Sequence, residues 1–406
     1  MSEYFDRLET RTADERAADQ GKMLQVQTDR ARALPGYSAV FEGVDPVRID
    51  HPDALVNLPV LRKGALLGAQ KPGMPFGGFA AHAASGFDHV FQSPGPIYEP
   101  GQTSTDWWRF GRFLHALGLG SGDIIQNCFS YHMTPAGMMF ENGARAVGAT
   151  VFPAGVGQTE LQVQAAHHLG VTAYAGTPDY LKTLLEAADA ADLPLQIIRA
   201  AVSGGALFPS LRQAYADCGI TCLQCYGTAD LGNIAYESPA QEGLIVDEGV
   251  IVEIVRPGTG DRVPEGEVGE VVVTSLTPDY PLIRFATGDL SAVMTGQSPC
   301  GRTNMRIKGW MGRADQTTKI KGMFVRPEQV AEFVARHDEV SRARVIATRE
   351  NEQDVMTVQI ETEICEPERF AKAISDTLKL RGTVELVAPG SLPNDGKVID
   401  DQRSYD

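Results

Sequence analysis

Three polar positions in the last third of this sequence are of types that bind nucleotides. Asp289 in PLIRFATGDL follows an apolar run, where its carboxylate could accept hydrogen bonds from both hydroxyls of a ribose. Arg313 begins the stretch RADQTTKIKGMFVRPEQV, and Lys397 stands alone in the predicted turn of LPNDGKVID. Taken singly, such an aspartate is an ion-pair partner and such a lysine is solvated. The elements that carry them decide whether they form a site.

Four turns of small residues could let a ligand approach the backbone. They are PAGVG at 153–157, AGTP at 175–178, SGGA at 203–206 and YGTAD at 226–230. Glycine at a strand end permits this approach because it has no Cβ. One such turn only ends a strand, but four at the same edge of a sheet favour a binding site.

Strand and helix patterns alternate from about residue 120 to residue 230. Apolar runs predict strands in DIIQNCF, TVFPAG, VTAYAGTP, IIRAAVSGGA and ITCLQCYGT, with helices in GMMFENGARAVG, TELQVQAAHHLG and PDYLKTLLEAADAA. This alternation predicts a parallel α/β sheet with crossover helices and a ligand site at the carboxyl ends of its strands. An apolar stripe also predicts a helix over DWWRFGRFLHALGL, capped by Ser104 or Thr105.

The pattern changes after this region. GVIVEIVRPGTGDRVPEGEVGEVVVTSL contains two β-rich runs joined by a Gly/Pro turn, which predicts antiparallel strands. After Asp315 the chain continues as a small α+β unit. We therefore predict an α/β fold with a large domain over 1–312, which combines parallel sheets, crossover helices and a β-rich subdomain, and a small α+β domain over 316–406.

The composition argues against several classes of protein. A net charge of −16 disfavours non-specific nucleic-acid binding, which needs a basic surface. The apolar runs are too short to span a bilayer, and the acidic start MSEYFDRLETRTADERAADQ is unlike a secretory signal. These features predict a cytoplasmic protein with neither a membrane nor a nucleic-acid partner. Its six cysteines are expected to be free thiols.

Cys218, Cys222 and Cys225 have the spacing of ligands to an iron–sulfur cluster. Such a cluster needs three thiolates that converge from a loop, whereas ITCLQCYG predicts a buried strand. A strand would point Cys222 and Cys225 to opposite faces, and buried cysteine is common in protein cores. The structural interpretation is therefore favoured.

The ordered set of motifs resembles the adenylate-forming superfamily of acyl-CoA ligases, most closely its phenylacetate–CoA ligase branch. The resemblance runs nearly end to end and includes LPGYSAVFEGV, GDIIQNCFSY, YGTADLG, TPDYPLIRFATGDL, CGRTNMRIKGWMGRADQTTKIKGMFVRPEQV and GSLPNDGKVID. It implies an enzyme that uses ATP and Mg²⁺ to convert an aryl or arylacetic acid into an acyl-adenylate. The small C-terminal domain would then rotate, and coenzyme A would take the acyl group. A homodimer is a further expectation from the family.

The resemblance also assigns roles to residues. Asp289 would hold the ribose with help from Arg313, and Tyr226 would stack on the adenine. Lys397 would bridge the substrate carboxylate and the α-phosphate, which Thr228 would also touch. Further nucleotide contacts would come from Gly204, Gly205, Gly227, Ser93 and Gly95. The hinge would be Asp315, and the positions that face the site in the CoA step would be Lys321 and Gly322.

The carboxylate pocket is expected in SYHMTPAGMMF, whose aromatic and soft apolar side chains suit an aromatic acid. The candidates are Tyr131, His132, Met133 and Phe140. His132 is equally well explained as a hydrogen-bonded core residue.

Some positions depart from the family pattern. The Mg²⁺-binding glutamate is Asp230 here, a hard oxygen ligand that is one methylene shorter. The acidic residue that usually follows the paired glycines is Ala206. Some relatives hold zinc, but the corresponding places here are Ser238, Ile245 and Ser298, which leaves only Cys300. Zinc needs about four N or S ligands, so we predict no structural zinc.

The largest departure is FQSPGPIYEPGQTST, residues 91–105, where the family has a phosphate-binding loop rich in Ser, Thr and Gly with a lysine. Three prolines remove amide donors, and Glu99 would repel phosphate. Either the loop is dispensable and Thr103, Ser104 and Thr105 bind phosphate at the start of the next helix, or ATP binding is weak or lost.

The retained nucleotide-binding and catalytic positions favour a working enzyme. An adenylating enzyme that passes its acyl group to an amine or a carrier protein, and a non-catalytic homologue that binds a ligand or a partner protein, stay open as alternatives.

Overall fold

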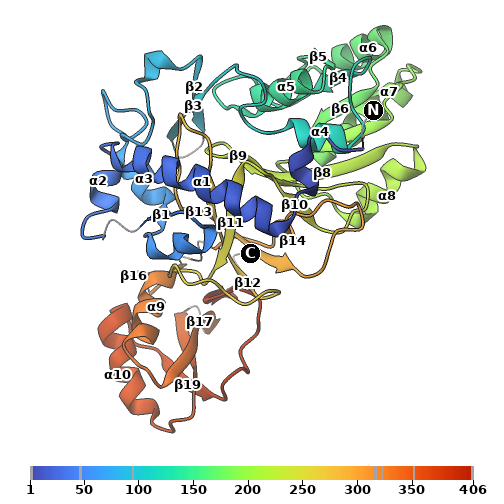
Figure 1. The fold of residues 1–406 in the computed structure, drawn as a ribbon. Helices are drawn as coiled ribbons and strands as arrows, with labels where there is room; N and C mark the ends of the chain where they lie inside the picture. Colours follow the sequence, from blue (N-terminus) through green and yellow to red (C-terminus); the bar gives the residue numbers. More distant parts are fainter. Residues whose placement is uncertain are drawn as a thin grey trace. The chain divides into compact units, whose positions relative to one another are not determined.

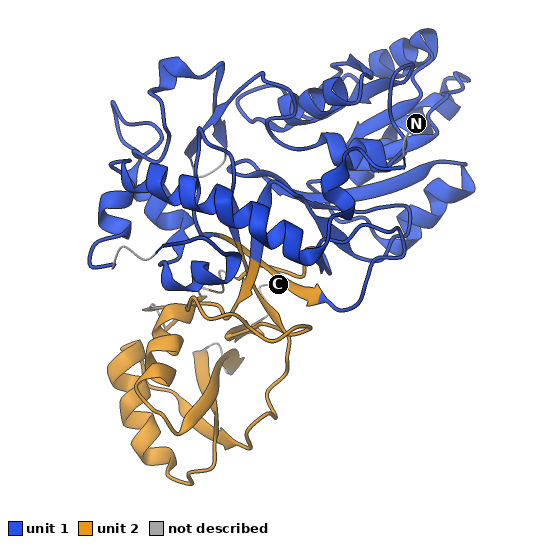
Figure 2. Cartoon of the chain, in the orientation of Figure 1, with its two compact units in different colours: residues 1–252, 273–285, 294–309 blue, residues 253–272, 286–293, 310–406 orange. Residues whose placement is uncertain are grey.

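The computed structural model describes residues 3–44, 48–93, 96–314, 316, 318–321, 323–350 and 353–403. The chain divides into two compact units (Figure 2). Unit 1 comprises residues 1–252, 273–285 and 294–309, and unit 2 comprises residues 253–272, 286–293 and 310–406. The predicted domain boundary between 312 and 316 stays a prediction, and the expected hinge, Asp315, lies outside the described residues.

Unit 1 begins with a series of helical segments. They are η1 (Arg7–Thr10), α1 (Ala13–Arg32), α2 (Tyr37–Val40), η2 (Pro52–Asn57), α3 (Lys63–Ala69) and η3 (Ala84–Gly86). The long helix α1, blue in Figure 1, starts at a capping box in which Thr12 and Glu15 each accept a hydrogen bond from the other's backbone N–H. No helix in the described part of the chain is both long enough and apolar enough to cross a membrane.

The parallel part of the sheet lies in unit 1 and confirms the predicted alternation. Its strands are β5 (Thr150–Phe152), β4 (Ile124–Asn127), β6 (Ala173–Gly176), β7 (Arg199–Val202) and β8 (Thr221–Thr228), in this spatial order. Each neighbouring pair is parallel. The connecting helices are α5 (Ala136–Ala146), α6 (Thr159–Leu169), α7 (Pro178–Ala190) and α8 (Pro209–Asp217).

The two faces of this sheet bury separate apolar clusters. Cys222 packs into one cluster with Tyr174 and Leu181, and Cys225 packs into the other with Phe129 and Phe140. Successive side chains of a strand point to opposite faces, so the two cysteines diverge as predicted.

Further strands extend the sheet beyond β8. They are β9 (Gly232–Tyr236), β10 (Leu244–Val246), β14 (Arg306–Ile307), β13 (Phe285–Met294), β12 (Val268–Ser275) and β11 (Val250–Val255), in spatial order from β8 to the far edge. The pairs β8–β9, β9–β10 and β10–β14 are antiparallel. The short β1 (Leu61–Arg62) pairs with β13, and β2 (His89–Ser93) and β3 (Ile97–Gly101) form a separate hairpin. The predicted runs around 250–255 and 268–275 are therefore neighbouring strands.

The C-terminal part of unit 2 has the predicted α+β pattern. Its sheet has the order β19 (Thr383–Val387), β18 (Gln353–Thr362), β17 (Val340–Glu350), β20 (Ile399–Asp401), and β15 (Thr318–Ile320) pairs with β16 (Met323–Val325). The helices α9 (Pro327–Ala335) and α10 (Pro367–Leu378) contribute Phe333 and Phe370 to an apolar core that also contains Val345 and Ile360.

The helix predicted over 106–119 is wrong in its first half, because only α4 (Gly111–Ala116) is helical. Asp106 and Arg109 have φ angles of 54° and 66°, and the Asp106 carboxylate accepts a hydrogen bond of 2.9 Å from the Gly111 N–H. The Arg109 guanidinium is buried and donates to the carbonyl of Leu231. This tertiary contact replaces the helical path, so neither Ser104 nor Thr105 is a cap.

Candidate active site

Three of the predicted turns lie at the ends of neighbouring parallel strands. β6, β7 and β8 pair in register, and the Ser203 hydroxyl donates to the Cys225 carbonyl at 3.0 Å, which joins the ends of β7 and β8. Gly204 has a φ of +71°, a conformation that favours glycine. A Cβ on Gly204 would meet Thr177 at an ordinary 3.9 Å, so backbone conformation, not space, requires this glycine.

The end of β8 carries Tyr226, Gly227 and Thr228, and the turn that follows carries Asp230. Tyr226 is buried, and a Cβ on Gly227 would lie 2.6 Å from the Gly232 carbonyl oxygen across the β8–β9 pair. The Thr228 hydroxyl accepts a hydrogen bond of 3.2 Å from the Leu231 N–H. The structure thus brings this motif to the sheet edge where the Ser203–Gly205 turn lies.

Asp230 forms an ion pair that the sequence did not reveal. Its Oδ2 lies 2.9 Å from the Nζ of Lys63, the first residue of α3. Lys63 directly follows β1, where the Leu61 N–H donates to the Arg284 carbonyl at 2.9 Å. The buried Arg284 also donates to the Leu58 carbonyl at 2.6 Å. Arg284 of the PLIRFATGDL motif therefore holds the segment 58–61, which lies just before Lys63.

The stretch that replaces the phosphate loop forms the hairpin β2–β3. Ser93 pairs with Ile97 and Phe91 pairs with Glu99. The inner face buries Ser93 and Glu99, and the Ser93 hydroxyl donates to Glu99 Oε1 at 2.5 Å. Burial, followed by the negative charge of Asp230, raises the pKa of Glu99 to about 8. The expected Gly95 lies outside the described residues.

This hairpin corrects two expectations. Glu99, expected in a loop, is a buried residue of strand β3. Thr103 does not stand at a helix start, and both its hydroxyl and its N–H donate to Asp88 at 2.6 and 2.7 Å. The helix start expected over Thr103, Ser104 and Thr105 is therefore wrong, and their contacts with phosphate stay a prediction.

Asp289 and Arg313, the expected ribose-binding residues, lie together in unit 2, and their role stays a prediction. Arg313 Nη1 lies 2.8 Å from Asp289 Oδ1, and the two residues also form a backbone bridge. The indole N–H of Trp310, a residue that is 60% exposed, donates to the same oxygen at 3.1 Å. Gly288 leaves room for the guanidinium, because a Cβ there would lie 2.8 Å from Arg313 Nη2.

Lys397 lines the same cavity of unit 2 as Arg313. This cavity has a volume of about 350 Å³, and Gln316 and Asp400 also line it. The ammonium of Lys397 lies 2.8 Å from Asp400 Oδ1, and Asp400 is also paired with Arg344 at 2.9 Å. Hydrogen bonds to Lys397 and to neighbouring groups outweigh partial burial and lower the pKa of Asp400 to about 2.

Gln316 holds the turn that carries Lys397. Its Nε2 donates to the Gly396 carbonyl at 2.9 Å, and its Oε1 accepts from the N–H groups of Val398 and Ile399 at 2.5 and 2.7 Å. A side-chain amide can make such bonds in both directions. The sequence had suggested no role for this glutamine.

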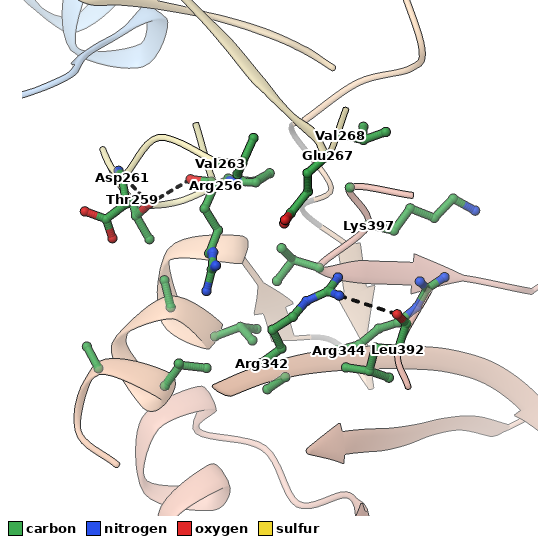
Figure 3. A pocket seen from close by; sticks show the side chains of 18 residues that line it. Arg256, Thr259, Asp261, Val263, Glu267, Val268, Arg342, Arg344, Leu392 and Lys397 are labelled. Atoms are coloured by element: carbon green, nitrogen blue, oxygen red, sulfur yellow. Dashed lines mark hydrogen bonds between the residues drawn. The ribbon is translucent and has the colours of Figure 1, made fainter. Parts of the chain in front are cut away.

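Lys397 also lies at the edge of a second cavity of unit 2, of about 170 Å³. Figure 3 shows Arg256 and Arg342 directed into this cavity, whereas the Lys397 side chain extends away from them. Lys397 is therefore placed toward the cavity that it shares with Arg313.

The positions expected in the CoA step are only partly described. Lys321 is exposed in the turn between β15 and β16, and its N–H donates to Asp354 Oδ2 at 3.0 Å. Gly322 lies outside the described residues.

The four residues of the expected acyl pocket do not share one environment. Tyr131 is half-buried and its hydroxyl accepts from Asn127 Nδ2 at 2.9 Å. His132 is exposed, so its interpretation as a core residue is wrong. Met133 is 63% exposed, and Phe140 is a core residue stacked on Phe129 at 4.3 Å.

The expected absence of zinc stays a prediction. Ser298 and Cys300 form a hydrogen bond of 3.0 Å with each other. Within the described residues, no three or more His, Cys, Asp and Glu side chains are arranged as a metal centre.

Comparisons with known proteins identify related chains. The family described as AMP-binding enzyme matches residues 103–277. The phenylacetate–coenzyme A ligase of Thermus thermophilus is 28% identical over 96% of each chain. That of Pseudomonas putida is 30% identical over 72% of this chain and 70% of its own length.

A solved structure agrees over nearly the whole chain. An open conformation of 2-hydroxyisobutyryl-CoA ligase in complex with 2-HIB-AMP and CoA has a TM-score of 0.73 and 25% identity, over 97% of this chain and 92% of its own. The α/β fold and the order of the site motifs thus have a common explanation. The chain belongs to the phenylacetate–CoA ligase branch of the adenylate-forming superfamily.

Proposed function

We propose that this chain, an AMP-forming acid–CoA ligase that works through an acyl-adenylate, activates an aromatic acid of the aryl or arylacetic class. ATP and CoA are its other small-molecule substrates. The aromatic class is supported by the relatives of Thermus thermophilus and Pseudomonas putida, which are phenylacetate–CoA ligases. Tyr131, half-buried beside the end of β4, is the pocket candidate that best suits such an acid. Use of Mg²⁺, a cytoplasmic location and a homodimer are further parts of the proposal.

The main support for the chemistry is the 350 Å³ cavity of unit 2, which Arg313 and Lys397 both line. Asp289 accepts from Arg313, so its carboxylate is already oriented by one cation. A ribose whose hydroxyls donate to Asp289 would bring its phosphate toward the two cations of this cavity, which Asp395, Asp400 and Asp401 also line. Such preorganised charge stabilises a transition state without reorganisation.

The two half-reactions assign separate tasks to these residues. In the first, a carboxylate oxygen of the acid attacks the α-phosphorus of ATP, and the bond to pyrophosphate breaks. Lys397 would offset the negative charge that accumulates on the carboxylate and the phosphate. In the second, the CoA thiol loses its proton and attacks the acyl carbon, and AMP leaves. Lys321 is proposed to act only in this second step.

A divalent cation fits residues of unit 1. Asp230 is buried, and its Oδ1 has no hydrogen-bond partner among the described residues. A carboxylate oxygen of this kind is the ligand that Mg²⁺ prefers. When bound, the ion would neutralise charge on the phosphates, and Thr228 in the same turn would contact the α-phosphate.

Acid-dependent ATP–pyrophosphate exchange tests the proposal. We expect exchange with benzoic or phenylacetic acid and little with short-chain acids. Lys397→Ala should abolish exchange, whereas Lys321→Ala, a lysine of the same unit, should retain exchange and lose thioester formation with CoA. No exchange with any acid would refute adenylation, and turnover that CoA does not increase would point to an amine or a carrier protein as acceptor.

A further inference from the structure

Two buried carboxylates in unit 1 each keep one oxygen without a hydrogen-bond partner among the described residues. Glu99 is 1% exposed and Asp230 is 6% exposed, and the unpartnered atoms are Glu99 Oε2 and Asp230 Oδ1. Leaving a buried polar oxygen unpaired costs about 1–3 kcal/mol, and more when it is charged. The charge of Asp230 acts on Glu99, and an unpaired oxygen on each of two interacting buried carboxylates indicates that a ligand belongs there.

The groups around these carboxylates come from separate parts of the chain. β3 supplies Glu99, the turn after β8 supplies Asp230, and the start of α3 supplies Lys63. The other oxygens are occupied, since Ser93 donates to Glu99 Oε1 and Lys63 donates to Asp230 Oδ2. The unpaired oxygens are therefore the ones available to a ligand.

Charge identifies the class of ligand. Because the pKa of Glu99 is raised to about 8, a bound cation has to displace a proton from it; once both carboxylates are ionised, Lys63 offsets only one of the two negative charges, whereas a dication would offset both. The Lys63 side chain is 37% exposed, so its ammonium can move to solvent when a cation binds.

A third buried group supports the same conclusion. The Tyr280 hydroxyl is buried and has no hydrogen-bond partner among the described residues. The nearby charges that act on it include those of Asp230 and Glu99. A hydroxyl at this place can bond to a water molecule carried by a metal ion, because Mg²⁺ usually keeps several waters.

We propose that Glu99 and Asp230 together hold one divalent cation, Mg²⁺ or Mn²⁺, and that Lys63 is the counter-charge in its absence. This proposal rests on the proposed function, in which Asp230 alone binds the ion. One or two carboxylates completed by water and substrate phosphate are the usual protein share of a Mg²⁺ site. The hairpin would then supply a ligand for the cation in place of the lysine of the usual phosphate loop.

Direct Mn²⁺ binding to the full chain tests the proposal, with free Mn²⁺ measured by electron paramagnetic resonance. We expect one site, which Glu99→Gln and Asp230→Asn each weaken by about tenfold or more, since even outer-shell changes cost metal sites this much. Asp106→Asn, which removes another poorly exposed carboxylate of unit 1, should leave the affinity unchanged. Lys63→Met should raise the affinity several-fold by removing the competing ammonium.

Each other outcome contradicts the proposal. Full Mn²⁺ affinity in Glu99→Gln would mean that Asp230 binds the ion without Glu99. The absence of a Mn²⁺ site in the folded wild type, or lower affinity in Lys63→Met, would also overturn it. Pyrophosphate exchange distinguishes failure of the metal site from failure of the proposed function. If the wild type catalyses exchange but Glu99→Gln keeps full Mn²⁺ affinity, only the two-carboxylate site is refuted. If the wild type binds Mn²⁺ at this site but catalyses no exchange, only the adenylation is refuted.

Discussion

Substitution of Gln316 by alanine should impair adenylation without unfolding the protein. The amide of Gln316 makes three hydrogen bonds to the backbone between Gly396 and Ile399, and Lys397 lies inside that span. Alanine removes all three bonds and leaves the Lys397 side chain unchanged. The turn would then be less ordered, and the Lys397 ammonium would no longer be held in one position by the three hydrogen bonds of Gln316, which we call the Gln316 clamp.

The magnitude follows from the number of bonds lost. At about 1 kcal/mol net for each hydrogen bond, the ordered turn loses about 3 kcal/mol relative to open conformations. Since about 1.4 kcal/mol corresponds to a factor of ten, exchange should fall by about 10- to 100-fold. The lower figure applies if water replaces part of the clamp. The melting temperature should change little, because the loss is confined to one turn.

Pyrophosphate exchange measures this effect, with two variants as controls. Gln316→Glu keeps the acceptor for Val398 and Ile399 but loses the donor to Gly396, so it should fall between wild type and Gln316→Ala. Gln329→Ala removes a glutamine of the same unit that accepts from the Arg326 N–H at the start of α9, and it should retain exchange. Wild-type exchange in Gln316→Ala would refute the view that this clamp positions Lys397.

Two further predictions concern stability in unit 1. Gly227→Ala should lower the free energy of unfolding by about 1–3 kcal/mol in urea, because its Cβ would lie 2.6 Å from the Gly232 carbonyl oxygen; a variant as stable as wild type would contradict that packing. Burial, together with the charge of Asp247, raises the pKa of Asp106 to about 7, despite the Gly111 N–H and nearby arginines that lower it. The folded state therefore holds a proton that the unfolded state loses near its ordinary pKa of 3.8, so stability should fall as pH rises from about 4 to 7. Asp106→Asn should remove this fall and gain about 2–4 kcal/mol relative to wild type between pH 5 and pH 8; parallel pH profiles would refute it.

The periodicity of apolar residues was sufficient to predict the strands and helices whose burial follows a regular pattern. Strands β4 to β8 and their helices follow from apolar runs and from glycine and proline at their ends, because a parallel sheet covered on both faces buries every residue of a strand. The divergence of Cys222 and Cys225 follows from the two-residue repeat of a strand. The ordered motifs also indicated that Asp289 and Arg313 act at one place, and the two residues are in contact.

The same reasoning failed where one long-range contact overrides a local pattern. The apolar stripe over 106–119 is buried in large part, yet α4 begins only at Gly111, because Arg109 bonds to the distant Leu231. The sequence predicted Glu99 as a loop residue that repels phosphate. In the structure it lies in β3, which pairs with β2, and its side chain is buried.

The linear order of residues was therefore enough to reveal the α/β fold, the family and the types of side chain that handle a nucleotide, since these depend on local periodicity and on motifs that keep their spacing. It could not reveal which charges meet. Lys63 lies 167 residues from Asp230 in the chain, and Gln316 lies 80 residues from Gly396. Strand pairing and turn closure between distant segments bring such partners together, so only the tertiary structure decided that Lys63 meets Asp230 in unit 1 and that Gln316 holds the turn of Lys397 in unit 2.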